Sequence, residues 1–218
     1  MRNGIEALVD AIRDDAADAV GLLVPVSGGS DSALAFWLCT QAFPEKTVAV
    51  HAGRALRGRP WFERTGRIEF TDVPGGDGER EEMRWARFLA MGLSRRAWLV
   101  GSRNRTEDAL GTYSLASRVA TFLPVVGVWK SDVQRLCAQV GVPAEIIASS
   151  LKADPECGRP AELAEIPFGL IETFLRVRSG ALPHEALSAL SAPQIAYLDG
   201  ILRRNAFKSR LPIRGASF

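Results

Sequence analysis

Hydrophobic residues follow two alternating patterns along the chain. Short apolar runs, which are typical of buried strands, occur at residues 21–26, 47–51, 98–101 and 122–126. Between these runs, apolar positions recur at every third or fourth residue, which predicts helices over residues 3–18, 33–41, 80–94 and 130–140. Strands that alternate with helices favour a parallel sheet with right-handed crossovers. The pattern therefore predicts a three-layer α/β fold.

Two stretches depart from this alternation. Residues 52–79 are rich in Gly, Pro and Arg, and within them only residues 68–72 are predicted as a strand. A loop of this length is more often functional than inert. The last part of the chain predicts helices over residues 167–177, 182–190 and 193–205. We expect one domain spanning residues 1–218, with a helical C-terminal part.

Composition narrows the class of protein. The 27 basic and 25 acidic residues among 218 leave a net charge of +2, less basic than is usual for a protein that binds duplex nucleic acid. No apolar run approaches the ~18 residues of a membrane span, and Glu6 and Asp10 interrupt any signal-peptide core. The three cysteines form no Cys-x-x-Cys pair, which excludes a zinc knuckle and argues against a disulfide framework. We expect a cytoplasmic protein.

Residues 27–32 read Ser-Gly-Gly-Ser-Asp-Ser and lie where the first predicted strand ends and a helix begins. The two glycines let the backbone turn tightly and direct successive N–H groups at one point, and the helix N-terminus adds a positive dipole end. This cradle suits phosphate but lacks the lysine of a Walker A loop. Asp31 would repel a phosphate unless a divalent cation lay between them, so the motif implies Mg²⁺. The alternative is a Ser/Gly turn in which Asp31 and Ser32 only cap the helix.

Residues 27–32 resemble the Ser-Gly-Gly-x-Asp-Ser motif of the PP-loop ATP pyrophosphatases. This resemblance implies an adenine nucleotide alpha-hydrolase-like parallel sheet and cleavage of ATP between its α- and β-phosphates. Residues 101–108 are similar to the NAD synthetase block Gly-Thr-x-Asn-x-[Ser/Thr]-Glu, in which Ser102 would contact ATP and Glu107 would be a second metal ligand beside Asp31. The alternative is that Thr106 or Asp108 caps a helix and Glu107 is solvated.

Three of the four lysines fall in segments that resemble the same family. Residues 124–147 resemble its Pro-Ile-Gly-Asp-Leu-x-Lys-[Ser/Thr] block, which assigns Lys130 to an ATP phosphate. Lys130 opens a helix, where the dipole disfavours a cation, so a charged ligand explains it better than a surface position does. Lys152 stands in a segment similar to Pro-[Ser/Thr]-Ala-Asp, and Lys208 in the closing Asn-x-x-Lys segment. The implied ATP-binding residues are Ser27, Gly28, Gly29, Ser30, Asp31, Ser32, Ser102, Lys130 and Lys152.

The substrate side departs from the family pattern. Arg84 matches the second arginine of an Ala-Arg-x-Arg-Met segment, and the resemblance implies that Arg84 and Lys208 bind the acid substrate. Glu82 stands in place of the first arginine, Leu115 in place of a lysine and Phe207 in place of a histidine. The loss of charged partners predicts poor use of deamido-NAD and a smaller, more apolar pocket on the acid side.

The resemblance implies an ATP-dependent ligase that forms an amide. A substrate carboxylate, that of deamido-NAD in the family, would attack the α-phosphorus of ATP, pyrophosphate would leave, and ammonia would displace AMP. Asp31 and Lys130 would be the catalytic residues, Asp31 and Glu107 the metal ligands, and ATP and Mg²⁺ the cofactors. We expect a homodimer, with ammonia either free or supplied by a separate glutaminase subunit, because 218 residues leave no room for a fused one.

Three alternatives remain. The same chemistry could act on a different small carboxylate. A tRNA-modifying enzyme would contact RNA phosphates through an arginine-rich strip, with Trp61 and Phe62 nearby. This strip consists of Arg54, Arg57, Arg59, Arg64 and Arg67. Against this alternative, the chain has no separate RNA domain and no catalytic cysteine pair. A relative that binds nucleotide without turnover is opposed by the presence of Asp31, Glu107 and Lys130.

Overall fold

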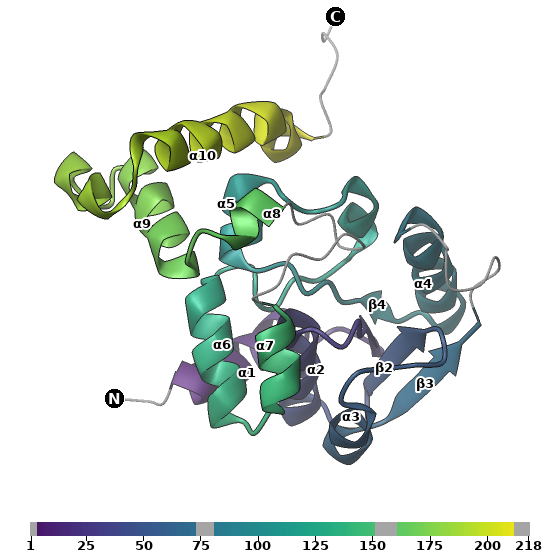
Figure 1. Ribbon diagram of the computed structural model, residues 1–218. Helices are drawn as coiled ribbons and strands as arrows, with labels where there is room; N and C mark the ends of the chain where they lie inside the picture. The colour runs from purple at the N-terminus through teal and green to yellow at the C-terminus, as the bar shows by residue number, and fades with distance from the viewer. Residues whose placement is uncertain (1–3, 73–80, 151–160, 212–218) are drawn as a thin grey trace, which may run out of the picture.

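A computed structural model describes residues 4–72, 81–150 and 161–211. Its centre is a parallel sheet whose strands lie in the order β3-β2-β1-β4 (Figure 1). The strands are β1 (Leu22–Pro25), β2 (Thr47–Ala52), β3 (Ile68–Thr71) and β4 (Trp98–Leu99). Because β1 pairs with both β2 and β4, the most apolar of the predicted runs lies in the middle of the sheet.

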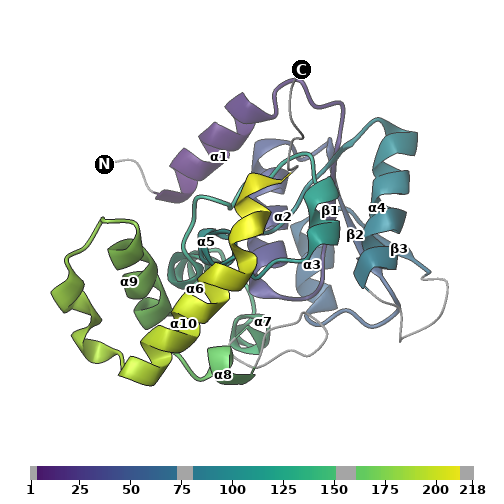
Figure 2. The ribbon, with the colours of Figure 1, turned by 90° about the horizontal axis from the view of Figure 1, so that it is seen from above.

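Helices cover both faces of this sheet (Figures 1 and 2). On one face lie α1 (Gly4–Asp15), α2 (Ser30–Ala42) and α6 (Lys130–Gln139), and on the other lies α4 (Glu81–Arg95). Leu22 and Val24 point into the core beneath the first group, whereas Leu23 and Val50 pack against Phe88 of α4. The predicted three-layer α/β fold is confirmed.

The C-terminal part forms a second group of helices with a core of its own. Its elements are α8 (Ala161–Ala164), α9 (Phe168–Arg178), η3 (His184–Ala189), α10 (Ala192–Asn205) and η4 (Ala206–Arg210), of which η3 and η4 are 3₁₀ helices. Phe174 and Leu198 are fully buried at its centre, and Leu110 of α5 (Arg105–Leu110) joins them. Figures 1 and 2 show α9 and α10 projecting to one side of the sheet and its covering helices. The predicted helical C-terminal part is confirmed.

Helix α6 connects the two cores. Trp129, immediately before its first residue, belongs to the core of the C-terminal part, and the guanidinium groups of Arg105 and Arg176 lie 4.4 and 5.0 Å from its ring centre. Val133 and Leu136, further along α6, belong to the core beneath the sheet. The N-terminus of α6 therefore lies where the two cores meet.

The strand predicted at residues 122–126 is wrong. Phe122 forms a single parallel bridge with Val100, and residues 124–127 then turn. Pro124 has no N–H to donate to a neighbouring strand, and Val125 is fully buried within the turn. Residues 182–190 form the short 3₁₀ helix η3 instead of the predicted α-helix.

The apolar spacing did not predict several short helices, among them α3 (Arg59–Thr65) and α7 (Ala144–Ser149). Each has fewer than eight residues, too few for an apolar repeat to be visible. Helix α3 lies in the arginine-rich stretch, and its Trp61 and Phe62 are buried, with the rings 5.1 Å apart. Neither ring is exposed to stack on a base, which weakens the tRNA alternative.

No helix in the described ranges is long and apolar enough to cross a membrane. Cys39 and Cys137 are free and buried, and burial raises the pKa of each thiol to about 12. Both therefore act as small core side chains and not as nucleophiles. Cys157 lies outside the described residues.

Candidate active site

Residues 27–29 form a tight loop between β1 and α2. Gly28 has φ of +80°, and a Cβ at this position would lie within 3.3 Å of the Cβ and backbone N of Arg57, so the loop requires glycine here. The Ser32 hydroxyl accepts a hydrogen bond from Ser27 N at 3.2 Å and donates one to Gly29 O at 3.0 Å. The hydroxyl groups of this motif thus hold the loop in shape.

The N-terminus of α2 is open. No side chain caps it, and in any α-helix the first N–H groups have no partner within the helix. The 13 residues of α2 align their peptide dipoles with the positive end at this loop. A Gly-rich loop that leads into an uncapped helix is a ready anion-binding site.

Side chains from distant parts of the chain meet at this N-terminus. Lys130 Nζ donates to Ser30 Oγ at 2.9 Å and forms an ion pair with Asp31 Oδ2. Asn104 Nδ2 donates to the other carboxylate oxygen of Asp31 at 2.9 Å. The Lys130 side chain is only 6% exposed, so it is not a surface lysine. We call Asp31, Lys130, Asn104 and Glu107 the Asp31–Lys130 cluster.

Asn104 connects Asp31 to Glu107. Asn104 Oδ1 accepts from Glu107 N at 3.0 Å, and the Glu107 carboxylate accepts from Asn104 N at 3.3 Å, so the two residues form a capping box at the start of α5. The cap is therefore Asn104, and neither Thr106 nor Asp108. Burial and the neighbouring charge of Asp31 raise the pKa of Glu107 to about 7. The two carboxylates lie close enough to repel each other.

A buried carboxylate supports the cluster from the C-terminal part. Glu172 of α9 accepts from Ser131 N at 2.9 Å, from the Ser131 hydroxyl and from Thr106 Oγ1 at 3.2 Å. Thr106 Oγ1 in turn accepts from Lys130 N at 3.1 Å. Glu172 therefore fixes the first turn of α6, which carries Lys130, across the junction between the two cores.

The donor set of the cluster suits a hard divalent cation. Mg²⁺ usually takes one or two protein carboxylates and completes its shell with phosphate oxygens and water, and Asp31 and Glu107 are such a pair. A cation near both would remove the repulsion that raises the pKa of Glu107. Within residues 4–72, 81–150 and 161–211, no group of three or more His, Cys, Asp or Glu could hold a metal ion. A Mg²⁺ ion held by Asp31 and Glu107 would take its remaining ligands from phosphate oxygens and water.

The other predicted site residues are more dispersed. Ser102 is partly exposed in the loop between β4 and α5, and Arg84 is partly buried on α4. Lys208 is partly buried in η4. Lys152 lies outside the described residues. The structure thus joins Asp31, Lys130 and, through Asn104, Glu107, but not Arg84 and Lys208.

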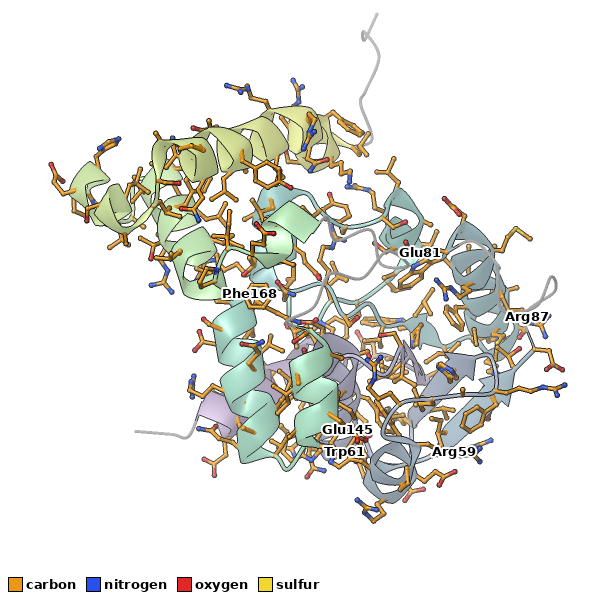
Figure 3. The ribbon with its side chains drawn as sticks, viewed as in Figure 1. Arg59, Trp61, Glu81, Arg87, Glu145 and Phe168 are labelled. Carbon is orange, nitrogen blue, oxygen red and sulfur yellow. The ribbon has the colours of Figure 1, made fainter. Side chains whose placement is uncertain are left out.

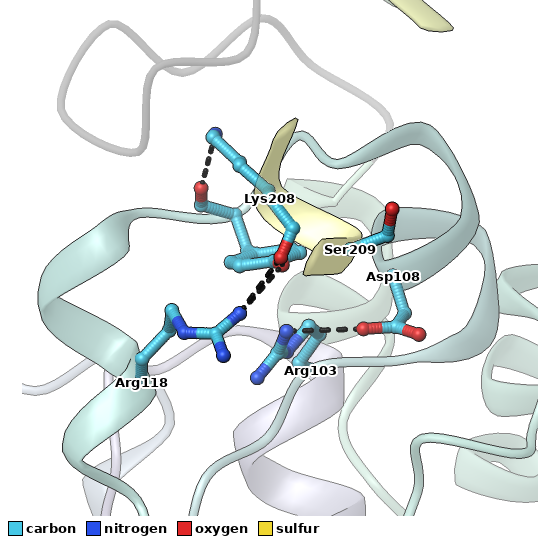
Figure 4. Close-up of a pocket in the computed structure, with 6 residues that line it drawn as sticks. Arg103, Asp108, Arg118, Lys208 and Ser209 are labelled. Carbon is cyan, nitrogen blue, oxygen red and sulfur yellow. Dashed lines mark hydrogen bonds and ion pairs between the residues drawn. The ribbon is translucent and has the colours of Figure 1, made fainter. Parts of the chain in front are cut away.

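Lys208 lines a cavity of about 280 Å³ (Figure 4), which we call the Lys208 cavity. Its lining residues are Arg103, Asp108, Tyr113, Arg118, Lys208 and Ser209. They come from the start of α5, from residues 113–118 leading into and through η2 (Leu115–Val119), and from η4. Arg103 directly precedes Asn104 in the chain, so the cavity begins one residue away from the Asp31–Lys130 cluster.

Sequence reasoning assigned no role to several residues at this site. Asn104 could have been found from the Asn-x-x-Glu spacing of a capping box. Glu172 and Arg103 left no such signal, because their partners lie in other elements. Phe168 is also new: it begins α9 and lies above the end of α6 (Figure 3), with its ring centre 5.9 Å from Lys130 Nζ.

The sequence of this chain is similar to those of known proteins. Residues 79–212, more than half of the chain, match the family model described as NAD synthase. The chain belongs to the NAD synthase family. The NH₃-dependent NAD⁺ synthetase of Methanosarcina mazei is 26% identical, with 97% of each chain covered. The enzyme of the same name from Leifsonia xyli is 27% identical over 78% of this chain and 75% of that one.

Solved structures of NAD synthases have the same fold. The NH₃-dependent NAD synthetase from Campylobacter jejuni superposes with a TM-score of 0.74 over 97% of both chains, at 17% identity. A structure titled NMN synthetase, from Francisella tularensis, superposes with a TM-score of 0.72 over 98% of this chain and 97% of that one, also at 17% identity. The suspected NAD synthetase relationship and the PP-loop fold are confirmed, and as a NAD synthase family member the chain is an ATP-dependent ligase.

Proposed function

We propose that this chain joins ammonia to a carboxylic acid and cleaves ATP to AMP and pyrophosphate in doing so. The observation that supports this most is the convergence of Lys130, Asp31 and Asn104 on the uncapped N-terminus of α2. The ATP phosphates would bind there, because the helix end and the ammonium group compensate negative charge. The proposed nucleotide-binding residues are those of the loop at 27–32, together with Ser102, Lys130 and Lys152.

Asp31 and Lys130 are the proposed catalytic residues. In the free protein the ammonium group of Lys130 neutralises Asp31. With nucleotide present, Asp31 and Glu107 would hold Mg²⁺, which supplies charge neutralisation for the leaving pyrophosphate. Lys130 would then exchange its carboxylate partner for a phosphate oxygen while it keeps its hydrogen bond to Ser30. No new buried charge is created by this exchange, which keeps its cost low.

The proposed reaction has two displacements. A carboxylate oxygen attacks the α-phosphorus, the bond to the bridging oxygen breaks, and pyrophosphate leaves. Ammonia then attacks the carbonyl carbon of the acyl-adenylate, AMP leaves with the electron pair of the broken C–O bond, and the nitrogen loses a proton. The contribution of the protein is to position the reactants and to place charge before the reaction begins.

The names of the relatives favour deamido-NAD as the acid, bound beside Arg84 and Lys208. A smaller acid is the second candidate. The Lys208 cavity, at about 280 Å³, is near the lower end of the ~300–1,000 Å³ usual for small-molecule sites. Leu115, where the family pattern has a lysine, is 47% exposed and carries no charge to offer a substrate. The Francisella tularensis neighbour, titled NMN synthetase, makes a mononucleotide acid a sensible member of any substrate panel.

The remaining elements of the proposal concern assembly. We take residues 1–218 as one catalytic domain that works in the cytoplasm as a homodimer. Ammonia would be used free or delivered by a separate glutaminase subunit. Neither nucleic acid nor a membrane has a part in the proposed reaction.

The test is pyrophosphate release from ATP and Mg²⁺ with ammonium chloride and a panel of acids. The panel contains deamido-NAD, nicotinic acid mononucleotide and small carboxylates without a nucleotide. We expect release over many turnovers to require both an acid and ammonia, with AMP and an amide as the other products. Formation of ADP, or no release with any acid, would show that the proposed function is wrong.

A further inference from the structure

The Lys208 cavity contains more positive than negative charge. Three of its lining side chains, Arg103, Arg118 and Lys208, are cationic, and Asp108 is the one carboxylate among the lining residues. Figure 4 shows the Arg103 and Arg118 side chains extending toward the same hollow. The Asp108 side chain is 47% exposed, so water weakens its compensation of Arg103, whose side chain is 10% exposed. Burial and the nearby Arg103 lower the pKa of Lys208, which is the response of an ammonium group to crowded positive charge.

Lys208 and Arg118 already donate hydrogen bonds to backbone carbonyls. Lys208 Nζ donates to the carbonyls of Gly111 and Tyr113, each at 2.7 Å. Arg118 donates to Lys208 O at 2.9 Å and to Leu211 O at 2.8 Å. These bonds fasten η4 and the residues after it to the 111–119 segment. Lys208 and Arg118 therefore have mainly a structural use in the free protein.

Arg103 differs from both. Its side chain is only 10% exposed, its guanidinium carbon lies 3.8 Å from the ring centre of Tyr113, and one terminal nitrogen donates to Asp108 Oδ1 at 3.0 Å. Its Nε is buried and meets no acceptor among the residues that the structure describes. A buried donor without an acceptor is rare, and each such group needs an explanation. The stacking on Tyr113 holds the guanidinium plane fixed, so its fork is oriented before any ligand arrives.

We propose that Arg103 is the binding residue for an oxyanion of the acid substrate, a phosphate or a carboxylate. An oxyanion in the cavity would offset the surplus positive charge that Arg103, Arg118 and Lys208 give it. Because Arg103 adjoins Asn104, the rest of the substrate would extend toward the Asp31–Lys130 cluster. The assignment of the oxyanion to the acid substrate rests on the proposed function, whereas the presence of an oxyanion site does not.

Binding measured without ATP tests this proposal. Three probes separate the sources of the oxyanion: nicotinic acid mononucleotide carries phosphate and carboxylate, nicotinamide mononucleotide carries phosphate alone, and nicotinic acid riboside carries carboxylate alone. Isothermal titration compares the wild type with Arg103→Gln. Arg135→Gln is the matched control, because Arg135 is an exposed arginine paired with Asp132 on α6, outside the cavity.

We expect Arg103→Gln to weaken binding of the phosphate-bearing probes, the carboxylate-bearing probes or both by about tenfold or more, with Arg135→Gln unchanged. Loss confined to the two mononucleotides identifies the phosphate as the ligand, and loss confined to the two nicotinates identifies the carboxylate. Wild-type affinity of Arg103→Gln for all three probes would overturn the proposal. Absence of binding of every probe to the wild type would overturn it as well.

Asp108→Asn distinguishes ligand binding from a structural ion pair. If Arg103 served only to pair with Asp108, both variants would lose affinity to the same degree. An oxyanion-binding Arg103 predicts equal or tighter binding in Asp108→Asn, because a competing carboxylate has been removed.

Turnover separates this proposal from the proposed function. In an active wild type, Arg103→Gln should raise the KM for the acid and leave the KM for ATP unchanged. Arg103-dependent binding in a protein that releases no pyrophosphate with any acid would leave the oxyanion site standing and refute the ligase proposal. If the wild type is an active ligase and Arg103→Gln leaves both probe binding and the KM for the acid unchanged, the ligase proposal stands and the oxyanion site is refuted.

Discussion

The Asp31–Lys130 cluster and the Lys208 cavity lie side by side and use their charged residues in opposite ways. In the cluster, charged side chains bond to other side chains: Lys130 to Asp31 and Ser30, and Asn104 to Asp31. In the cavity, Lys208 and Arg118 bond mainly to backbone carbonyls. A contact between two side chains requires both residue types, whereas every residue has a carbonyl to offer. The first kind of contact therefore leaves a motif in the sequence, and the second does not.

Mutations in the cluster and in the cavity should also have different consequences. Loss of a member of the cluster leaves another charged side chain without its partner at the proposed reaction centre. Loss of Lys208 frees two carbonyls on a loop and loosens a segment of the chain. We therefore expect mutations in the cluster to act mainly on rate, and mutations in the cavity to act mainly on stability and on affinity for the acid. Five variants test this contrast.

Asp31→Asn should have the largest effect. The amide keeps the size of the side chain but removes the charge that would hold Mg²⁺ and that pairs with Lys130. We expect pyrophosphate release to fall by about 10³-fold or more, equivalent to roughly 4 kcal/mol. Asp132→Asn, an exposed acid on α6, is the control. A rate within tenfold of the wild type would remove Asp31 from the reaction.

Lys130→Arg should reduce pyrophosphate release by about 10²-fold while the fold is kept. The charge remains, but a planar guanidinium cannot replace a compact ammonium group in the buried space between Ser30 and Asp31. Steady-state rates and near-UV circular dichroism measure the two parts of this expectation. Lys46→Arg is the control, because Lys46 bonds a backbone carbonyl, that of Ala19. Equal rates for the two variants would contradict the role given to Lys130.

Glu172→Gln should lower kcat by about tenfold with little change in the KM for ATP. The amide is close in shape to the carboxylate but accepts more weakly from Ser131 and Thr106, so the first turn of α6 is held less firmly. Glu185→Gln, on the exposed surface of η3, is the control. A loss of thermal stability with an unchanged kcat would mean that Glu172 only holds helices together.

Lys208→Met should act mainly on stability. It removes two hydrogen bonds to the carbonyls of Gly111 and Tyr113, which we expect to cost about 1–2 kcal/mol and to lower the Tm by ~2–6 °C. Thermal unfolding, combined with kcat at saturating ATP and acid, checks the expectation. If kcat fell as much as in Lys130→Arg, cavity mutations would act on rate as cluster mutations do, and the proposed contrast would be wrong.

Glu107→Gln should change stability in the opposite direction. Because the pKa of Glu107 is raised to about 7 in the folded protein, ionisation of this carboxyl opposes folding as the pH rises from its unfolded value near 4.5 through 7. The variant loses that penalty and keeps the capping box. We expect its Tm without nucleotide to exceed that of the wild type at pH 8, and the gap to close below about pH 4.5. A gap independent of pH would contradict this account.

The sequence predicted the fold where local pattern and tertiary structure agree. The runs that became β1 and β2 are apolar on both faces because they are central in a parallel sheet. The run at 122–126 is also apolar but has Pro124 at its centre. It was misassigned because apolarity alone does not separate a strand from a buried turn. Helix α3 was missed because it is short and its two adjacent aromatic residues, Trp61 and Phe62, show no helical spacing.

The site residues also divide into those that a local motif predicted and those that it did not. Asp31, Glu107 and Lys130 were predicted because their motifs are local, and the structure places them together through Asn104. The segment that ends at Glu172 resembles a family block that ends in an acid, but the burial of Glu172 was not predicted. A carboxylate on an amphipathic helix is usually solvated, and this one is buried because α9 packs against α6. The sequence does not distinguish Arg103 from the many other arginines. Its distinguishing property, a buried Nε without an acceptor, can be seen only in the structure.

The junction of two cores at the start of α6 also bears on how the protein would lose activity. Folded domains open in cooperative units, and a group of helices with its own core is such a unit. If α9 and its neighbours opened as one, Trp129 would lose its packing and the first turn of α6 would lose Glu172, while the sheet stayed folded. Lys130 would then fray with that turn. Opening of the C-terminal helices alone would therefore end activity before the sheet that carries the nucleotide loop melts.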